Sequence, residues 1–246
     1  AMMLAARQAY ADFVNGSPDE IVFGSNMTTL TFHLSRALGW QWGEGDTIVV
    51  TALDHRANVD PWMALAGERG LTIRMVEFDH ATGDLDWDGL AEALDDSVVL
   101  TAVCGASNAL GSVIDLARVR AMTNDVDSLL FIDAVHYAPH ILTDVQALGC
   151  DYLACSPYKF YGPHIGVLWG RRDLLDPLPT PRLEPASNAM PERMETGTLS
   201  HEGIADQGRT ELALDWIEPR FDRGAVSPRD LVRGYRLARA AEGPEA

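Results

Sequence analysis

The chain has 246 residues, a formal net charge of −17 and a pI near 4.6, and 47% of its residues are hydrophobic. Such a negative charge argues against nucleic acid and anionic membranes as partners, because both repel an acidic surface. No apolar run approaches the ~20 residues that span a bilayer, so we expect one large buried core and no membrane segment.

Short apolar runs alternate with stretches of helical periodicity along most of the chain. The predicted strands cover residues 20–23, 47–52, 71–78, 97–103, 129–132, 151–155 and 165–169. The helices predicted between them cover residues 28–38, 61–69, 87–94, 116–122 and 144–148. Buried strand runs separated by helices are typical of βαβ units. The pattern therefore predicts an α/β fold with a mostly parallel central sheet and helices on both faces.

The chain changes character beyond the last predicted strand. Residues 177–191 are rich in proline, which marks the end of the compact sheet. Residues 205–217 and 229–241 have the periodicity of helices, and the last few residues are expected to fray.

The three cysteines, Cys104, Cys150 and Cys155, make no disulfide framework and lack the spacing of metal ligands. Read from Met2, the chain also starts without a signal peptide. We therefore expect a cytoplasmic protein with no metal site. Cys155 falls in a predicted strand, where a small buried apolar role is favoured over a nucleophilic one.

Lysine occurs once in the chain, at Lys159, while arginine supplies the other basic residues. Arginine can replace lysine on a surface, but a guanidinium does not deprotonate and so cannot trap a carbonyl group. A lysine amine forms Schiff bases with aldehydes, including pyridoxal 5'-phosphate. Lys159 follows a short apolar strand, in a turn rich in glycine and proline. A catalytic lysine and a chance survivor in an arginine-rich sequence both remain open at this point.

Polar side chains follow several of the predicted strands. His55, Asn108 and Asp133 each come at or after the end of one strand, and Ser156 and Lys159 follow another. Because the carboxyl ends of parallel strands meet in one crevice, where ligands bind, we expect these side chains to lie together.

Two sequence features, the start of a predicted helix at Thr28 and the carboxylate of Asp133, match the chemical groups of pyridoxal phosphate. The helix predicted to open at Thr28, after Asn26, offers N–H groups and hydroxyls to a phosphate. A carboxylate at Asp133 would keep the pyridine nitrogen protonated. Each residue also has an ordinary alternative: Asn26 and Thr28 as helix caps, Asp133 as the cap of the following segment, and His55 as a solvent-facing loop residue.

Six motifs occur in a fixed order along the chain. They are Phe23-Gly-Ser-Asn-Met27-Thr28-Thr, Asp54-His55-Arg-Ala57-Asn58-Val-Asp-Pro61-Trp62, Ser107-Asn108-Ala-Leu-Gly111, Ile132-Asp133-Ala-Val-His136, Ser156-Pro-Tyr158-Lys159-Phe-Tyr161-Gly162-Pro163 and Glu195-Thr196-Gly197-Thr198. As a set they resemble the large domain of the class V aminotransferases, the group that includes the cysteine desulfurases and selenocysteine lyases. The resemblance covers roughly residues 20–203.

The resemblance implies fold type I, pyridoxal phosphate as cofactor, and a homodimer. It implies that Lys159 and His55 are catalytic, Lys159 through a Schiff base and His55 by stacking on the cofactor ring. The remaining cofactor-binding residues that it implies are Met27, Thr28, Asn108, Asp133, His136, Ser156, Tyr158, Gly197 and Thr198.

Several of these implied roles differ in detail from the family pattern. Asn26 and Met27 replace the family's usual pair of glycine and a small residue at the phosphate. Tyr158 replaces a histidine that binds the phosphate, and His136 replaces a glutamine that binds the ring hydroxyl. Gly197 and Thr198 are implied to reach the phosphate of the neighbouring subunit.

The chain also lacks parts that the family normally carries. We assign residues 1–203 to a cofactor-binding large domain and residues 204–246 to a helical tail, with no counterpart of the C-terminal small domain. In the desulfurases that small domain holds the sulfur-accepting cysteine and the arginine that clamps the substrate carboxylate. The chain is therefore a natural short paralogue, a fragment, or the product of an interrupted gene.

Three hypotheses of function follow. The first is a pyridoxal-phosphate enzyme that acts on an amino acid or amine through a Lys159 Schiff base, by desulfuration, transamination or epimerisation. The second is a truncated, catalytically weak or inactive cofactor-binding dimer. The third is an ordinary α/β binding domain without a cofactor. None of them includes nucleic acid or a membrane as a partner.

Overall fold

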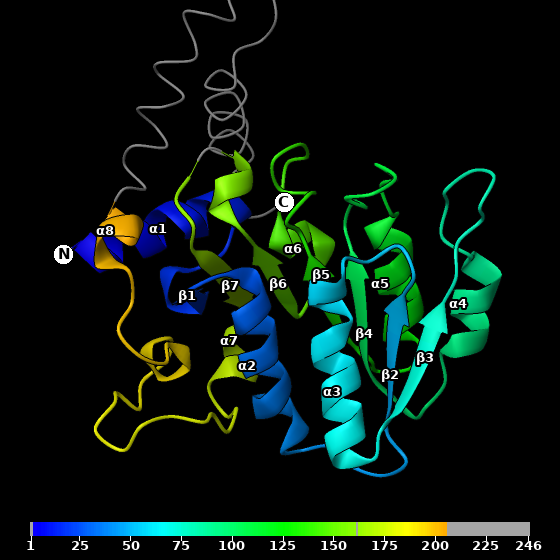
Figure 1. The fold of residues 1–246 in the computed structure, drawn as a ribbon, viewed down its shortest axis with the longest axis horizontal. Helices are drawn as coiled ribbons and strands as arrows, with labels where there is room; N and C mark the ends of the chain where they lie inside the picture. The colour runs from blue at the N-terminus through cyan, green and yellow to red at the C-terminus, as the bar shows by residue number, and fades with distance from the viewer. Residues whose placement is uncertain (1, 161, 206–246) are drawn as a thin grey trace, which may run out of the picture.

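A seven-stranded sheet runs through the part of the chain that the computed structural model describes, residues 2–160 and 162–205 (Figure 1). The strands are β1 (Ile21–Gly24), β2 (Thr47–Thr51), β3 (Thr72–Val76), β4 (Val98–Cys104), β5 (Leu129–Asp133), β6 (Tyr152–Cys155) and β7 (Gly166–Gly170). Their order is β1-β7-β6-β5-β4-β2-β3. The strands from β2 to β6 pair in parallel, while β7 runs antiparallel to both β6 and β1. The predicted mostly parallel sheet is confirmed.

Helices cover both faces of this sheet, as the sequence predicts (Figure 1). On one face lie α2 (Met27–Gly39), α3 (Asp60–Arg69) and α7 (Arg172–Leu175). On the other face lie α1 (Met2–Val14), α4 (Trp87–Ala93), α5 (Leu116–Asn124), α6 (Val145–Leu148) and α8 (His201–Ala205). Within the described residues, four short 3-10 turns connect the larger elements: η1 (Pro18–Glu20), η2 (Arg56–Asn58), η3 (Pro157–Phe160) and η4 (Glu192–Met194).

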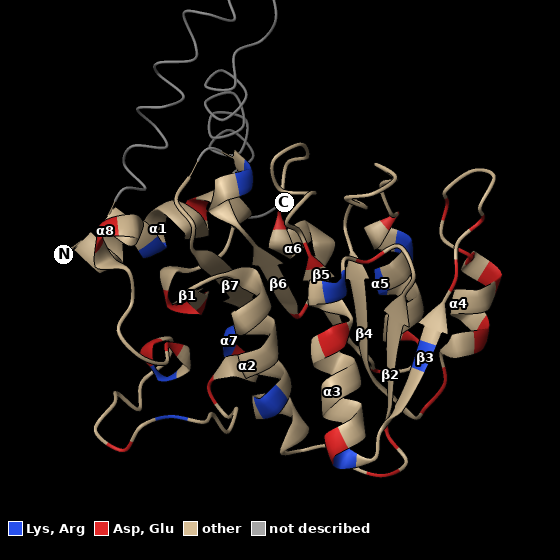
Figure 2. Ribbon diagram, viewed as in Figure 1, with Lys and Arg blue, Asp and Glu red and all other residues tan. Residues whose placement is uncertain are grey.

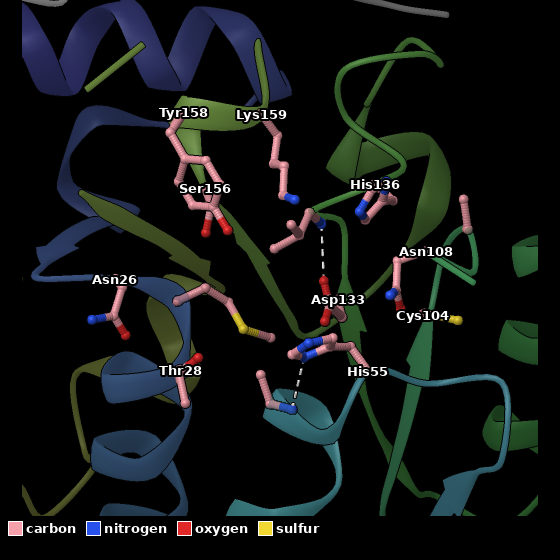
Figure 3. Close-up of a pocket in the computed structure, with 14 residues that line it drawn as sticks. Asn26, Thr28, His55, Cys104, Asn108, Asp133, His136, Ser156, Tyr158 and Lys159 are labelled. Atoms are coloured by element: carbon pink, nitrogen blue, oxygen red, sulfur yellow. Dashed lines mark hydrogen bonds between the residues drawn. The ribbon is translucent and has the colours of Figure 1, made fainter. Parts of the chain in front are cut away.

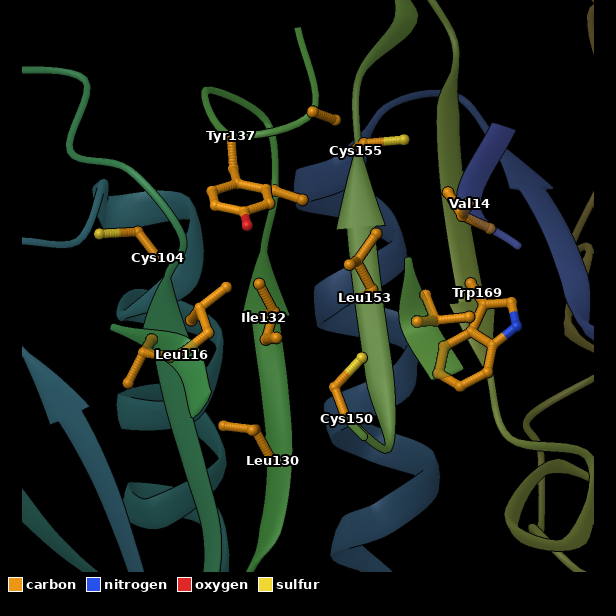
Figure 4. Packing of buried hydrophobic residues seen from close by; sticks show 14 of the residues in the cluster. Val14, Cys104, Leu116, Leu130, Ile132, Tyr137, Cys150, Leu153, Cys155 and Trp169 are labelled. Atoms are coloured by element: carbon orange, nitrogen blue, oxygen red, sulfur yellow. The ribbon is translucent and has the colours of Figure 1, made fainter. Parts of the chain in front are cut away.

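The two hydrophobic cores follow from the alternation of side chains along each strand. In β2, Ile48 and Val50 point to the core under α2 and α3, and Val49 points to the opposite core. Because both sets are buried, strands such as β2 read in the sequence as unbroken apolar runs. The buried side chains of the larger core include all three cysteines (Figure 4).

Part of the acidic surplus serves as helix caps. The carboxylates of Asp86, Asp115 and Asp144 accept hydrogen bonds from the first-turn N–H groups of α4, α5 and α6. Other acidic residues are spread over helices and loops, and the strands are nearly free of charge (Figure 2). Among the described helices, none is long and apolar enough to cross a membrane.

The helix α1 is an element that the sequence analysis missed. Its buried residues, Ala6, Arg7, Tyr10, Ala11 and Val14, have helical spacing but include two small residues and a charged one. The predicted helix over residues 205–217 coincides with the described chain only at the end of α8, and the rest of it, with the helix over residues 229–241, lies outside the described residues.

One buried carboxylate, directly before β6, connects α5, β5 and the residue after β7. Asp151 is 1% exposed and accepts hydrogen bonds from Arg120 Nη1 at 3.0 Å, from Arg171 Nη1 at 2.7 Å and from the N–H of Leu130 at 2.8 Å. Removing it leaves a buried N–H without a partner and two guanidinium groups without their buried acceptor.

We predict that Asp151→Ala lowers the free energy of unfolding by about 2–4 kcal/mol. The matched control is Asp173→Ala, which removes the exposed partner of the same Arg171 and is expected to cost less than about 1 kcal/mol. Urea denaturation followed by circular dichroism measures both. Equal losses in the two variants would show that Asp151 is not a structural anchor.

Candidate active site

A cavity of about 150 Å³ opens at the carboxyl ends of the parallel strands, beside the first turn of α2. Nine of the eleven predicted site residues line it, namely Met27, Thr28, His55, Asn108, Asp133, His136, Ser156, Tyr158 and Lys159. Figure 3 shows Lys159 and Asp133 directed toward one space, with Thr28 on one side of it and Asn108 and His136 on the other. The prediction that the strand ends bring these side chains together is confirmed.

The first turn of α2 forms one wall of the cavity. Asn26 caps the helix, as the alternative in the sequence analysis predicts, by accepting a hydrogen bond from the N–H of Thr29 at 2.9 Å. It also lines the cavity. The remaining first-turn N–H groups have no acceptor within the helix, which suits an anion. Gly166 of β7 holds this turn close, because a Cβ there would lie 2.3 Å from the carbonyl carbon of Asn26. A larger residue at position 166 would push the start of α2 away.

Asp133 is the buried charge of the site. It ends β5, is 4% exposed, and accepts a hydrogen bond from the N–H of Val135 at 2.9 Å. Burial raises the pKa of Asp133 to about 6, and the bond from Val135 offsets part of that effect. The carboxylate therefore both caps the following turn and presents a negative charge to the cavity at neutral pH.

A second carboxyl group lies beside Asp133 and was not predicted as a site residue. Asp54 accepts hydrogen bonds from Thr51 Oγ1 at 2.5 Å and from Asn58 Nδ2 at 2.7 Å. Desolvation raises the pKa of Asp54 to about 8 despite these bonds, and the negative charge of Asp133 adds to the rise. Asp54 thus keeps its proton at neutral pH and leaves Asp133 as the ionised member. The only signal in the sequence is the place of Asp54 directly before His55.

The same network fixes the turn that carries His55. Asn58, fully buried, accepts a hydrogen bond from Trp62 Nε1 at 3.1 Å while donating to Asp54. The exposed ring of His55 accepts a hydrogen bond at Nδ1 from the N–H of Ala57 at 3.0 Å. A neutral His55 ring therefore carries its proton on Nε2. His55 is exposed in a loop, as the alternative in the sequence analysis predicts. It also lines the cavity.

Lys159 enters the cavity from η3. Its Nζ lies 5.1 Å from the centre of the Tyr158 ring, and that ring stacks on His164 at 4.8 Å. Among the described residues no carboxylate forms an ion pair with Lys159, so the amine is available for chemistry.

His136 lies beside this amine. Its pKa is lowered by desolvation, and electrostatic interaction with Lys159, His140 and His55 lowers it further. A neutral imidazole at this position can accept a hydrogen bond at one nitrogen and donate one from the other.

Gly197 and Thr198 do not line the cavity. They are exposed on the segment between η4 and α8, where Gly197 has a φ of 81°. Their expected contact with a neighbouring subunit stays a prediction.

All three cysteines are free and buried. The small buried role favoured for Cys155 is confirmed, since it is 1% exposed. Cys104 lines the cavity, but its pKa is raised by burial, and the neighbouring carboxyl groups of Asp54 and Asp133 raise it further. None of the three is poised as a thiolate nucleophile.

One family model and a group of cysteine desulfurases match the sequence of this chain. The family model described as aminotransferase class-V matches residues 1–221, beyond the range of the six motifs. A cysteine desulfurase of Yersinia pestis is 36% identical over 180 residues, which are 72% of this chain and 44% of that protein.

Solved structures give the same picture. The apo structure of a cysteine desulfurase from Thermococcus onnurineus superposes with a TM-score of 0.80 at 29% identity, covering 88% of this chain and 57% of that one. The cysteine desulfurase CsdA of Escherichia coli gives 0.79 at 27% identity with the same coverage. The chain thus spans about half the length of the relatives that it matches.

Proposed function

The chain belongs to the class V aminotransferase family, and we propose that it binds pyridoxal 5'-phosphate on Lys159 and acts on the amino group of an amino acid or amine. The observation that carries the proposal is the meeting of Lys159 and Asp133 in one cavity at the strand ends. The sheet order and the superposition on cysteine desulfurase structures support a fold type I large domain, to which we assign residues 1–203.

The residues of the cavity fit this cofactor. The free lysine amine would bind its aldehyde, the buried carboxylate of Asp133 would face its ring nitrogen, and the first turn of α2 would hold its phosphate. When bound, pyridoxal phosphate withdraws electrons from the α-carbon of the substrate.

Lys159 and Asp133 have the two central roles. The Lys159 amine would hold the cofactor covalently and would move a proton at the substrate α-carbon. The Asp133 carboxylate, ionised above about pH 6, holds the proton on the ring nitrogen. The protonated Asp54 beside it adds no second charge.

The remaining cavity residues orient the group. His55 stacks on the ring from the turn that Asp54 and Asn58 fix. Asn108 and neutral His136 bind the ring hydroxyl on the side away from α2. The phosphate is bound by Met27, Thr28, Ser156 and Tyr158, from the first turn of α2 and from β6 and η3.

We further propose a homodimer in which Gly197 and Thr198 of one subunit reach the phosphate of the other. Their exposure outside the cavity of their own subunit supports this arrangement. Size-exclusion chromatography with light scattering tests it, and a monomer with full cofactor occupancy would refute it. The three unpaired thiols support a cytoplasmic location.

Mass spectrometry tests the covalent attachment directly. After incubation with pyridoxal phosphate and reduction with borohydride, we expect one pyridoxyl group on the peptide that contains Lys159. Because Lys159 is the only lysine, any other site would be the N-terminal amine. An intact protein that carries no adduct on this peptide would overturn the proposed function.

The pKa of Asp133 predicts how cofactor affinity depends on pH. Asp133 is ionised above about pH 6 and becomes protonated as the pH falls through that value, so affinity is expected to fall with it. Asp133→Asn is expected to weaken binding at pH 8 by about 10–100-fold, the worth of a charge-assisted hydrogen bond.

Fluorescence titration with pyridoxal phosphate from pH 5 to pH 8 measures both proteins. The phosphate titrates in the same range, so the dependence that remains in Asp133→Asn belongs to the phosphate. Parallel pH profiles for the two proteins would contradict the role of Asp133.

A catalytically weak cofactor-binding dimer is the second candidate. No arginine is among the residues that line the cavity in the described part of the chain, so a bidentate clamp for a substrate carboxylate is not provided there. Amine exchange on the bound cofactor, with little preference among amino acids, would favour this candidate over a specific enzyme.

A further inference from the structure

The helix α1 carries a buried arginine, Arg7, whose guanidinium contacts the edge strand β1 and the segment around Glu195. Arg7 is 5% exposed and donates from Nη1 to the carbonyl oxygen of Ile21 at 2.6 Å. Its guanidinium also forms a two-pronged ion pair with Glu195, at 2.7 Å from Nη1 to Oε1 and at 2.8 Å from Nη2 to Oε2. Both side chains are nearly withdrawn from solvent, with exposures of 6% and 5%.

Glu195 is more than a partner for the arginine. Its Oε1 also accepts a hydrogen bond from the N–H of Phe23 at 2.8 Å. Phe23 lies in β1, three residues before Asn26, and the Arg7 guanidinium packs over its ring at 5.3 Å. One carboxylate therefore joins α1, the strand that leads into the first turn of α2, and the segment that leads to Gly197.

A second contact ties α1 to the turn of the lysine. The ring of Phe13 stacks on Phe160, the residue after Lys159, at 5.0 Å between centroids. The helix thus contacts η3 directly, and it contacts the two residues, Phe23 and Glu195, that lead into the first turn of α2 and into Gly197.

We propose that Arg7 is a positioning residue of the cofactor site, which fixes through Glu195 the loop that carries Gly197 and Thr198. A partner of opposite charge stabilises a buried carboxylate, and the planar fork of an arginine fixes the direction as well as the charge of the contact. The residues 196–198 are exposed, so Glu195 is the buried anchor that directly precedes them. The inference rests on the proposed function, in which Thr198 contacts the phosphate.

A double-mutant cycle tests the coupling. Thr198→Ala is expected to weaken pyridoxal phosphate binding about tenfold in the wild-type background. In an Arg7→Met background the same change is expected to cost less than about twofold, because the hydroxyl is no longer held in place. The matched control background is Arg172→Met, which breaks the exposed pair with Asp19 and should leave the tenfold cost intact.

The alternative of a purely structural arginine gives a different result. General destabilisation would leave the two effects additive, so an unchanged cost of Thr198→Ala in the Arg7→Met background would overturn the inference. An absent cost in the wild type would overturn it too, since the loop would then hold no contact to position. Where Arg7→Met does not fold, Arg7→Lys keeps the buried positive charge and loses the fork.

Amide hydrogen exchange without cofactor supplies a readout that does not depend on binding. Exchange over residues 195–199 should be faster in Arg7→Met than in wild type or in Arg172→Met, while exchange over β4 and β5 should not change. Unchanged exchange over residues 195–199 would overturn the inference whatever the protein binds. A wild-type protein without a Lys159 adduct would overturn the proposed function instead.

Discussion

Replacing Lys159 by arginine is expected to abolish the covalent attachment of pyridoxal phosphate and to lower the turnover of any amine substrate by about 10²–10⁴-fold. The variant keeps the positive charge, so electrostatic attraction for the phosphate should survive. The guanidinium does not deprotonate, so it can neither bond to the aldehyde nor move a proton at the substrate α-carbon.

Absorbance of the bound cofactor and single-turnover kinetics measure this loss. Lys159→Ala with added methylamine gives a second readout, because a free amine can enter the space that the side chain leaves and restore part of the rate. The control Arg171→Lys introduces an amine at a partly exposed ion pair outside the cavity and should gain no adduct. Undiminished turnover in Lys159→Arg would exclude Lys159 from the chemistry.

The sheet was predictable because burial on both faces makes each strand an unbroken apolar run in the sequence. Runs such as residues 129–132 are apolar residue by residue, and the helices between them carry regular stripes. The helix α1 was missed because what holds it is not local. Arg7 finds its partner 188 residues away in the sequence, and an arginine within an apolar stripe argues against burial until that partner is known.

The site was predictable to the extent that strand ends place side chains. His55, Asn108, Asp133 and Lys159 come from four different strand ends, and the parallel topology alone brings them to one cavity. The ordinary alternative for Asp133 was also correct, since the same carboxylate caps a turn and faces the cavity. A capping role and a functional role are therefore not exclusive.

Asp54 marks the limit of that reasoning. The raised pKa of Asp54 could not be predicted from the polar stretch after the strand, because the desolvation that causes it comes from the packing of distant segments. Gly197 and Thr198 mark another limit, because their expected contact lies on a second subunit.

The cysteines test whether this chain can itself perform the reaction for which its cysteine desulfurase relatives are named. Burial raises the pKa of Cys150 and of Cys155 to about 12, and the pKa of Cys104 is raised by burial, Asp54 and Asp133. The thiolate is the form that attacks sulfur, and a pKa near 12 lowers its population at neutral pH by roughly three orders of magnitude relative to an ordinary thiol.

We therefore predict that no cysteine of this chain accepts sulfur from a cysteine substrate. Any sulfide released from cysteine should stay within about twofold of wild type in Cys104→Ala, Cys150→Ala and Cys155→Ala, because buried thiols take no part in the step. Sulfide release with and without an added thiol, and mapping of persulfides by mass spectrometry, measure this. Cys104 is the most exacting case, since it alone of the three lines the cavity. A persulfide on Cys104, lost together with sulfide release in Cys104→Ala, would show that burial and the neighbouring Asp133 carboxylate do not keep this thiol protonated once the cofactor is bound.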